Sequence, residues 1–273
     1  MELLNILMLL FLKKIKAFFL LILFTLSINC FSQNELPYKV SEKLSYDISF
    51  IGIKVGEANL QISSLEYINK KPCFHIIGSG KTSPFFDIFF KVRDKYETFL
   101  DTSLILPIRF KRDISEGGFK KKQLYNFNHI DTVVYFKDTL HQISKSTQDM
   151  LSALFLARTF DDKNLKINDK FIVPIFMDEE NYFLEIKYLQ KDTLNTDFGN
   201  VECLVFKPLM QEGRVFENGE KMKIWISNDK NRLLLKVETQ IWAGKIVAML
   251  IDYTNIKYSL NITKEMAIHV NHM

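Results

Sequence analysis

A glycine-rich string at residues 78–82, Gly-Ser-Gly-Lys-Thr, comes closest in this sequence to a chemical motif. A phosphate-binding loop ends in Gly-Lys-Ser/Thr, and it needs another glycine five residues before that last glycine. His75 stands at that position, and Ser83 and Pro84 follow where a helix should begin. Without the first glycine and the helix, the string does not predict nucleotide binding.

The other residues that could bind a metal or act in catalysis are scattered. His269 and His272 form an H-x-x-H pair, but a zinc site usually needs three or four ligands, so a solvated tail is expected. The acidic clusters Asp161–Asp162 and 178–180 lie where an expected helix or strand ends, which is typical of solvated turns. The sequence contains no G-x-S-x-G, H-E-x-x-H or C-x-x-C motif. We therefore expect a non-enzymatic protein with no catalytic residue, metal ligand or cofactor; an enzyme acting on envelope glycans would need two converging carboxylates.

Composition is that of an ordinary globular protein. The 273 residues are 47% hydrophobic and 25% charged, which excludes a disordered chain, and the formal net charge is only +4. Such a balance argues against a nucleic-acid partner. At this length one core is stable without a metal or a disulfide.

Apolar and polar residues alternate through most of the chain, which predicts strands. In Glu42–Phe50 the residues Leu44, Tyr46 and Ile48 fall on one face. Similar runs follow at 58–62, 73–77, 96–99, 107–112, 123–127, 132–136, 170–177, 182–189, 201–207, 221–227, 232–242 and 245–258. About a dozen strands at hairpin spacing predict a mainly β fold with one large antiparallel sheet, curved or closed into a (half-)barrel.

One segment departs from this alternation. Ser146 and Asp149 form a capping-box pattern, and apolar residues then recur at helical spacing, which predicts a helix from Thr147 to Phe160. Its apolar stripe, which includes Leu151 and Phe155, is expected to pack on the concave face of the sheet.

The N-terminal segment resembles an export signal. Lys13, Lys14 and Lys16 precede an apolar run from 17 to 28, and small residues precede a cleavage site after Ser32. We expect residues 1–32 to be removed, leaving residues 33–273 as one domain without a permanent transmembrane helix. Two alternatives stay open, namely translation from Met8 rather than Met1 and lipidation of Cys30.

Two cysteines remain after the leader. Cys73 and Cys203 lie in apolar, strand-like runs, so they are either two buried small side chains or a possible disulfide in an oxidising compartment. Sequence alone does not pair them.

Aromatic residues are concentrated in one short segment. Phe85, Phe86, Phe89 and Phe90 cannot all face one core, so the alternatives are simple core packing, a loop anchored under the helix, a cover for the mouth of a barrel and the lining of an apolar cavity. Together with Leu151 and Phe155 they are the candidate lining residues of an apolar ligand site.

Basic residues surround one expected hairpin. Arg109, Lys111 and Arg112 precede its turn, and residues 120–122 are all lysine. Such a ribbon either contacts an anionic lipid or polysaccharide, or protects an exposed strand from edge-to-edge aggregation.

Three motifs resemble a known family when they are taken in order. They are GIKVGEANL at 52–60, DMLSALFLAR at 149–158 and IWISNDKNRLLLKVE at 224–238, and Glu42, Leu44 and Tyr46 match an opening E-x-L-x-Y strand. The sequence thus resembles the bacterial exported proteins of the domain of unknown function 3108 family. Arg232, Leu233 and Leu234 depart from the R-x-P that the family often carries there.

The resemblance implies a secreted or periplasmic β-rich fold similar to the curled half-barrels of lipoprotein carriers. It implies no activity. The matched positions instead have structural roles in this resemblance, namely Gly56 at a turn, Asp149 as a helix cap and Trp225 in packing. We therefore expect an exported protein, periplasmic or outer-membrane associated, that binds a lipid or lipoprotein acyl chain in an apolar groove. The alternative is an envelope scaffold that interacts with other proteins and has no cavity.

Overall fold

The computed structural model describes residues 35–210 and 222–263. The chain divides into two units, Met1–Leu36 and Pro37–Met273, and all the described strands and helices belong to the second. The expected leader, Cys30, and the pair His269 and His272 lie outside the described residues.

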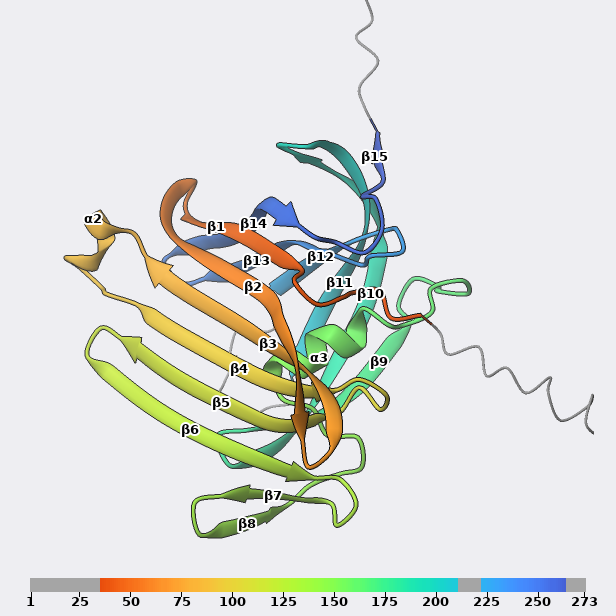
Figure 1. Ribbon diagram of the computed structural model, residues 1–273. Coiled ribbons are helices and arrows are strands. Elements are labelled where there is room, and N and C mark those ends of the chain that lie inside the picture. The colour runs from red at the N-terminus through yellow and green to blue at the C-terminus, as the bar shows by residue number, and fades with distance from the viewer. Residues whose placement is uncertain (1–34, 211–221, 264–273) are drawn as a thin grey trace, which may run out of the picture. The chain divides into compact units, whose positions relative to one another are not determined.

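The described part of the chain forms one antiparallel sheet of 15 strands with two helices, which confirms the predicted fold class (Figure 1). The first eight strands are β1 (Lys43–Phe50), β2 (Ile53–Ile68), β3 (Lys71–Thr82), β4 (Arg93–Asp101), β5 (Pro107–Glu116), β6 (Phe119–Asn128), β7 (Val133–Phe136) and β8 (Thr139–Gln142). The others are β9 (Lys170–Met177), β10 (Glu180–Thr196), β11 (Gly199–Met210), β12 (Met222–Ser227), β13 (Leu234–Ile241), β14 (Gly244–Thr254) and β15 (Ile262–Thr263). The helices are α2 (Pro84–Asp87) and α3 (Met150–Ala157).

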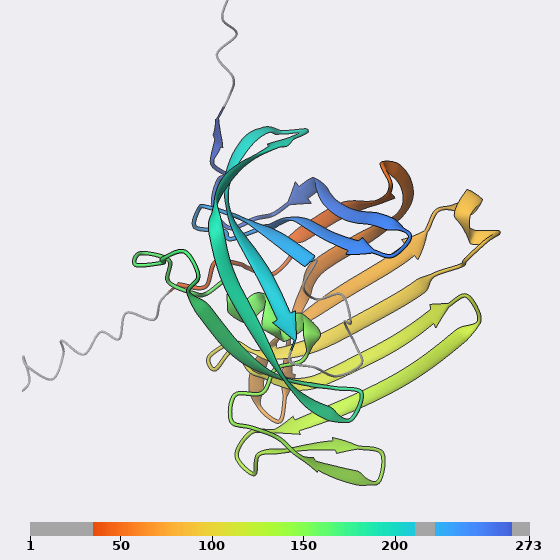
Figure 2. The same cartoon turned by 180° about the vertical axis from the view of Figure 1, so that it is seen from behind.

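The strands are ordered β8-β7-β6-β5-β4-β3-β2-β1-β14-β13-β12-β11-β10-β9, and β15 pairs with β11. The two halves are joined where β1 pairs with β14, and the sheet stays open between β8 and β9. It curves so strongly around α3 that Phe176 of β9 packs against Phe110 of β5 and Tyr125 of β6 (Figures 1 and 2). Successive hairpins with one apolar face explain this arrangement, because each strand can bury that face only by curling toward the others.

Helix α3 is shorter than the sequence predicted. Ser146 has φ of +61°, outside the helical range, and Gln148 pairs with β9 through its amide to Pro174 O at 2.8 Å. Asp149 is therefore the N-cap, and its Oδ1 accepts from the amides of Leu151 and Ser152 at 2.8 and 2.9 Å. The cap role that the family resemblance implied for Asp149 is thus observed, three residues after the expected Ser146.

Two glycine-containing segments also differ from expectation. Gly56 lies inside β2 rather than at a turn, and a Cβ there would lie 2.5 Å from the carbonyl oxygen of Lys81. Residues 78–82 belong to strand β3, so the string that resembles a phosphate-binding loop is extended.

Candidate apolar binding site

An apolar cavity of about 250 Å³ lies between α3 and the sheet. Seventeen of its 21 lining residues are apolar. The helical segment contributes Met150, Ala153, Leu154, Ala157 and Phe160, and the strands β9 to β12 contribute Phe171, Ile175, Met177, Leu184, Ile186, Leu204, Phe206, Pro208, Met222, Ile224 and Ile226. The remaining apolar lining residue is Leu165. Alternation along each strand explains why every second residue faces the cavity.

Charged groups in the lining gather after the C-terminus of α3. They are Arg158, Asp161, Asp162 and Arg232, and Arg232 forms an ion pair with Asp162. Asp161 is exposed, so this end of the lining reaches solvent. The site therefore combines an apolar interior with a few polar groups at one end, a pattern common to small-molecule sites.

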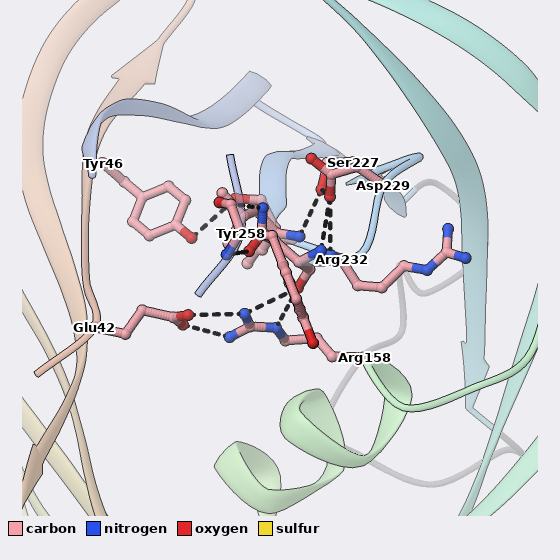
Figure 3. Close-up of polar contacts among 10 residues, drawn as sticks. Glu42, Tyr46, Arg158, Ser227, Asp229, Arg232 and Tyr258 are labelled. Atoms are coloured by element: carbon pink, nitrogen blue, oxygen red, sulfur yellow. Dashed lines mark hydrogen bonds and ion pairs between the residues drawn. The ribbon is translucent and has the colours of Figure 1, made fainter. Parts of the chain in front are cut away.

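A buried ion pair fixes α3 over the sheet (Figure 3). Arg158, the C-cap of α3, is 2% exposed, and Glu42, just before β1, is 1% exposed. Their side chains bond in a bidentate manner, with Nη1 to Oε1 at 2.5 Å and Nη2 to Oε2 at 3.0 Å. Arg158 also lies over the rings of Tyr38 and Phe155, at 5.1 and 5.3 Å.

The ion pair continues into the turn between β12 and β13. Arg158 donates through Nε and Nη2 to the carbonyl oxygen of Asn231, at 3.1 and 2.9 Å. Asp229 Oδ1 accepts from the hydroxyl of Ser227 and from the amide of Asn231, at 2.8 and 2.9 Å, and Tyr46 donates to Leu234 O at 2.9 Å (Figure 3). We call Glu42, Arg158 and the turn 227–231 the buried brace.

The brace joins three of the four segments that carry the family resemblance, all except residues 52–60. Glu42 and Tyr46 come from the opening strand motif, Arg158 ends the helix motif, and Ser227 and Asp229 belong to the late motif. Burial raises the pKa of Tyr46, which keeps its hydroxyl protonated as a donor. The motifs thus build the frame that positions the cavity, and the helix and late motifs also supply part of its apolar lining, among them Met150, Leu154 and Ile224.

The expected lining residues lie elsewhere. None of Phe85, Phe86, Phe89, Phe90, Leu151 and Phe155 is among the residues that line the cavity. Phe85, Phe89 and Phe90 are exposed on the loop between β3 and β4, with Phe86 half-buried beside them. Leu151 faces Gly78 of β3, and a Cβ added to that glycine would lie 3.1 Å from Leu151 Cδ2. Phe155 is buried against the ring of Tyr38.

One of the two acidic clusters, residues 178–180, meets the basic ribbon at one point. Asp178 Oδ1 accepts from Arg112 at 2.8 Å, from Lys121 at 2.5 Å and from Gln123 at 3.3 Å. These interactions lower the pKa of Asp178, although burial opposes them. Among the described residues, no three His, Cys, Asp or Glu side chains gather as a metal site.

Cys73 and Cys203 are both buried and both free. They lie in β3 and β11, which are not neighbours in the sheet, so the possible disulfide is not formed and the two are buried side chains. Burial raises the pKa of the Cys203 thiol to about 11 and also raises that of Cys73.

We expect both thiols to resist alkylation in the native protein. Only the thiolate reacts, and at neutral pH a thiol of pKa about 11 holds very little of it. Iodoacetamide labelling followed by peptide mass spectrometry should modify Cys73 and Cys203 slowly in buffer and completely in urea. Rapid labelling of either in buffer would contradict this burial.

The fold and the cavity define a class of protein, an open antiparallel sheet that curls around one helix and an apolar pocket. Residues 45–251 match the family described as "Protein of unknown function (DUF3108)", and the chain belongs to that family, as its motifs indicated. The family description names no activity. A comparison of the sequence with curated proteins finds no match.

Three solved structures match the chain at low sequence identity, and one of them has a TM-score above 0.5. A β-barrel-like protein of domain of unknown function DUF1849 from Brucella abortus has a TM-score of 0.53 at 10% identity, covering 79% of this chain and 98% of its own. A "putative lipoprotein" from Parabacteroides distasonis has a TM-score of 0.37 at 10% identity, covering 80% and 97%. A "putative exported protein with YmcC-like fold" from Bacteroides fragilis has a TM-score of 0.33 at 10% identity, covering 81% and 98%. At 10% identity the first of these matches shows a similar fold and nothing about function. The other two have TM-scores below 0.5, and nothing is inferred from them.

No helix in the described part of the chain is long and apolar enough to cross a bilayer.

Proposed function

We propose that this protein is exported to the cell envelope and binds one lipid acyl chain, without catalysis, in the cavity under α3. The observation that carries the proposal is the cavity itself, with its seventeen apolar lining residues and charged groups at one end. Its volume of about 250 Å³ lies just below the usual range of ligand pockets, so it suits part of a single chain rather than a whole lipid.

Chain length should control the affinity. Each methylene moved from water into an apolar site contributes about 0.8 kcal/mol, or roughly a fourfold change in Kd. A series of saturated fatty acids should therefore bind more tightly with each added methylene until the cavity is full, and then level off. The carboxylate is expected near Arg232, whose ion pair with Asp162 lies at the charged end of the lining.

Filling the cavity should abolish binding. Ile186 of β10 lines the cavity, whereas Ile172 of the neighbouring β9 is exposed and does not line it. We expect Ile186→Trp to weaken fatty-acid binding at least about tenfold, because the larger indole ring occupies space that several methylenes of the ligand would otherwise fill. Ile172→Trp, the matched control, should bind as the unchanged protein does.

Titration with cis-parinaric acid, read by its fluorescence, measures both variants. Circular dichroism checks that Ile186→Trp keeps its sheet. No binding by the unchanged protein, or equal binding by a folded Ile186→Trp variant, would contradict the acyl-chain site and favour an envelope scaffold.

A further inference from the structure

Four hairpin turns lie together at one end of the sheet (Figures 1 and 2). The turns β1–β2, β3–β4 and β5–β6 share this end because their strands alternate in direction. The β13–β14 turn joins them, since β14 pairs with β1 and places Ile246 opposite Phe50. We call these four turns, with the residues that flank them, the aromatic tips.

The tips expose large apolar side chains. On the β3–β4 loop, Phe85 is 65% exposed, Ile88 79%, Phe89 73% and Phe90 54%. Phe119 at the start of β6 is 57% exposed, and Trp242 on the β13–β14 turn is 94% exposed. Single exposed apolar residues are normal, and the opposite end of the sheet also exposes some, such as Leu104 and Ile130. Five exposed aromatic rings gather only at the tips among the described residues, and such a cluster indicates an interaction surface.

The exposed rings are held in place. Thr82 donates to Asp87 Oδ1 at 2.6 Å, and Arg93 binds the same carboxylate through Nη2 to Oδ2 at 2.5 Å, which closes the base of the β3–β4 loop. Phe85 makes edge-on contacts with Phe86 and Phe89, with ring centroids 5.2 and 5.7 Å apart. The rings are therefore presented to solvent by an ordered loop.

Neighbouring tips contact each other in pairs. Gly117 of the β5–β6 turn has φ of +54°, and the ring of Phe90 lies over it, so that an added Cβ would meet Phe90 Cε2. Gly244 of the β13–β14 turn lies in the same way against Ile51 of the β1–β2 turn, whose Cγ1 would be 2.7 Å from an added Cβ. The tips thus project from one connected edge.

Exposed cations flank every tip. Lys54 follows the first turn, Lys91 lies on the β3–β4 loop, Lys120 follows Phe119, and Lys245 follows the β13–β14 turn. Two of them already have carboxylate partners on the flanking strands, since Lys54 pairs with Asp47 and Glu57 and Lys245 pairs with Glu238. The carboxylate on the β3–β4 loop, Asp87, is neutralised by Arg93. Aromatic rings with lysines beside them are the composition that anchors proteins at the interface of anionic membranes.

We propose that the aromatic tips dock on the surface of a bilayer that contains anionic lipid, with the rings entering the headgroup region and the lysines contacting phosphates. The cations complement an anionic surface, and the apolar side chains project from four separate turns rather than lining one groove. A fluid surface can accept all four turns without a matching shape, whereas a protein partner would need a complementary surface. None of the exposed rings and lysines of the aromatic tips lines the cavity, so this docking surface is separate from the acyl-chain site.

Tryptophan fluorescence tests the docking directly. The chain has two tryptophans, of which Trp225 is buried and Trp242 is exposed on a tip. Vesicles of phosphatidylethanolamine and phosphatidylglycerol should shift the emission of Trp242 to shorter wavelength and protect it from acrylamide. Vesicles of phosphatidylcholine alone should do so much more weakly, and high salt should reverse the effect in part.

Matched variants locate the surface. Phe85→Ser with Phe89→Ser removes two rings from the tips and should lower the vesicle partition constant at least about tenfold. Leu104→Ser with Ile130→Ser changes two side chains of similar exposure at the opposite end of the sheet and should leave it within about twofold. The N-terminal residues are the same in all proteins compared, so differences report the tips.

An unchanged Trp242 emission would overturn the proposal and leave a protein partner for this surface. Equal losses in the two double variants, or equal shifts with both vesicle types, would overturn it too.

Discussion

Replacement of Glu42 by alanine should lower the free energy of unfolding by about 3 to 5 kcal/mol, because it leaves the buried Arg158 without its counter-charge. The guanidinium would keep its bonds to Asn231 O and its contacts with the rings of Tyr38 and Phe155. None of these carries the negative charge that offsets the loss of water around a buried cation. Urea unfolding followed by circular dichroism measures the change.

A double variant separates charge from packing. Glu42→Leu with Arg158→Met replaces the whole ion pair with apolar side chains, and such replacements are often neutral or stabilising. The double variant should therefore be more stable than Glu42→Ala, although the Asn231 carbonyl oxygen loses its two donors. A loss below about 1 kcal/mol in Glu42→Ala would contradict the role assigned to the buried brace.

The second large effect concerns pH. Burial raises the pKa of the Asp149 carboxyl from 3.8 to about 6, against the helix amides and the Thr98 hydroxyl that favour its ionised form. Thr98 donates to Asp149 Oδ2 at 2.5 Å, and Asp149 is fully buried. The native protein thus holds the proton of the Asp149 carboxyl more tightly than the unfolded chain does. The carboxyl therefore contributes stability that is fully present below about pH 4 and is lost as the pH rises through about 6.

Asp149→Asn should remove this dependence and keep the cap. Asparagine accepts the same two amide hydrogen bonds and caps helices as well as aspartate does. As the pH rises from below about 4 to above about 6, the free energy of unfolding of the unchanged protein should fall by about 2 to 3 kcal/mol relative to that of the variant. Urea unfolding across this window, on both proteins, gives the difference, and parallel pH profiles would show that the Asp149 pKa is not raised.

The strands were predictable because their signal is local. Leu44 and Tyr46 alternate with polar residues in β1, and both are buried in the sheet as this alternation requires. The helix was predictable for the same reason, but its start was not. Gln148 pairs with Pro174 and Phe176 of β9, and no local pattern indicates that these distant residues end the helix early.

The candidate site could not be predicted, because its parts are distant in sequence. Glu42 and Arg158 are 116 residues apart, and the cavity takes its lining from α3 and four strands. The exposure of the aromatic segment could not be predicted either, although its residues are close together in sequence. Phe85 and Phe89 have the residue type of a cavity lining, and only their place on an end loop of the sheet reveals that they face solvent.

Native mass spectrometry of the protein purified from a bacterial envelope tests acyl-chain binding in the cavity without an added probe. We expect one bound lipid or fatty acid per protein, identified by extraction, and its absence from the Ile186→Trp variant but not from Ile172→Trp. A protein of clean apo mass that also fails to take up added fatty acids would contradict acyl-chain binding in the cavity under α3.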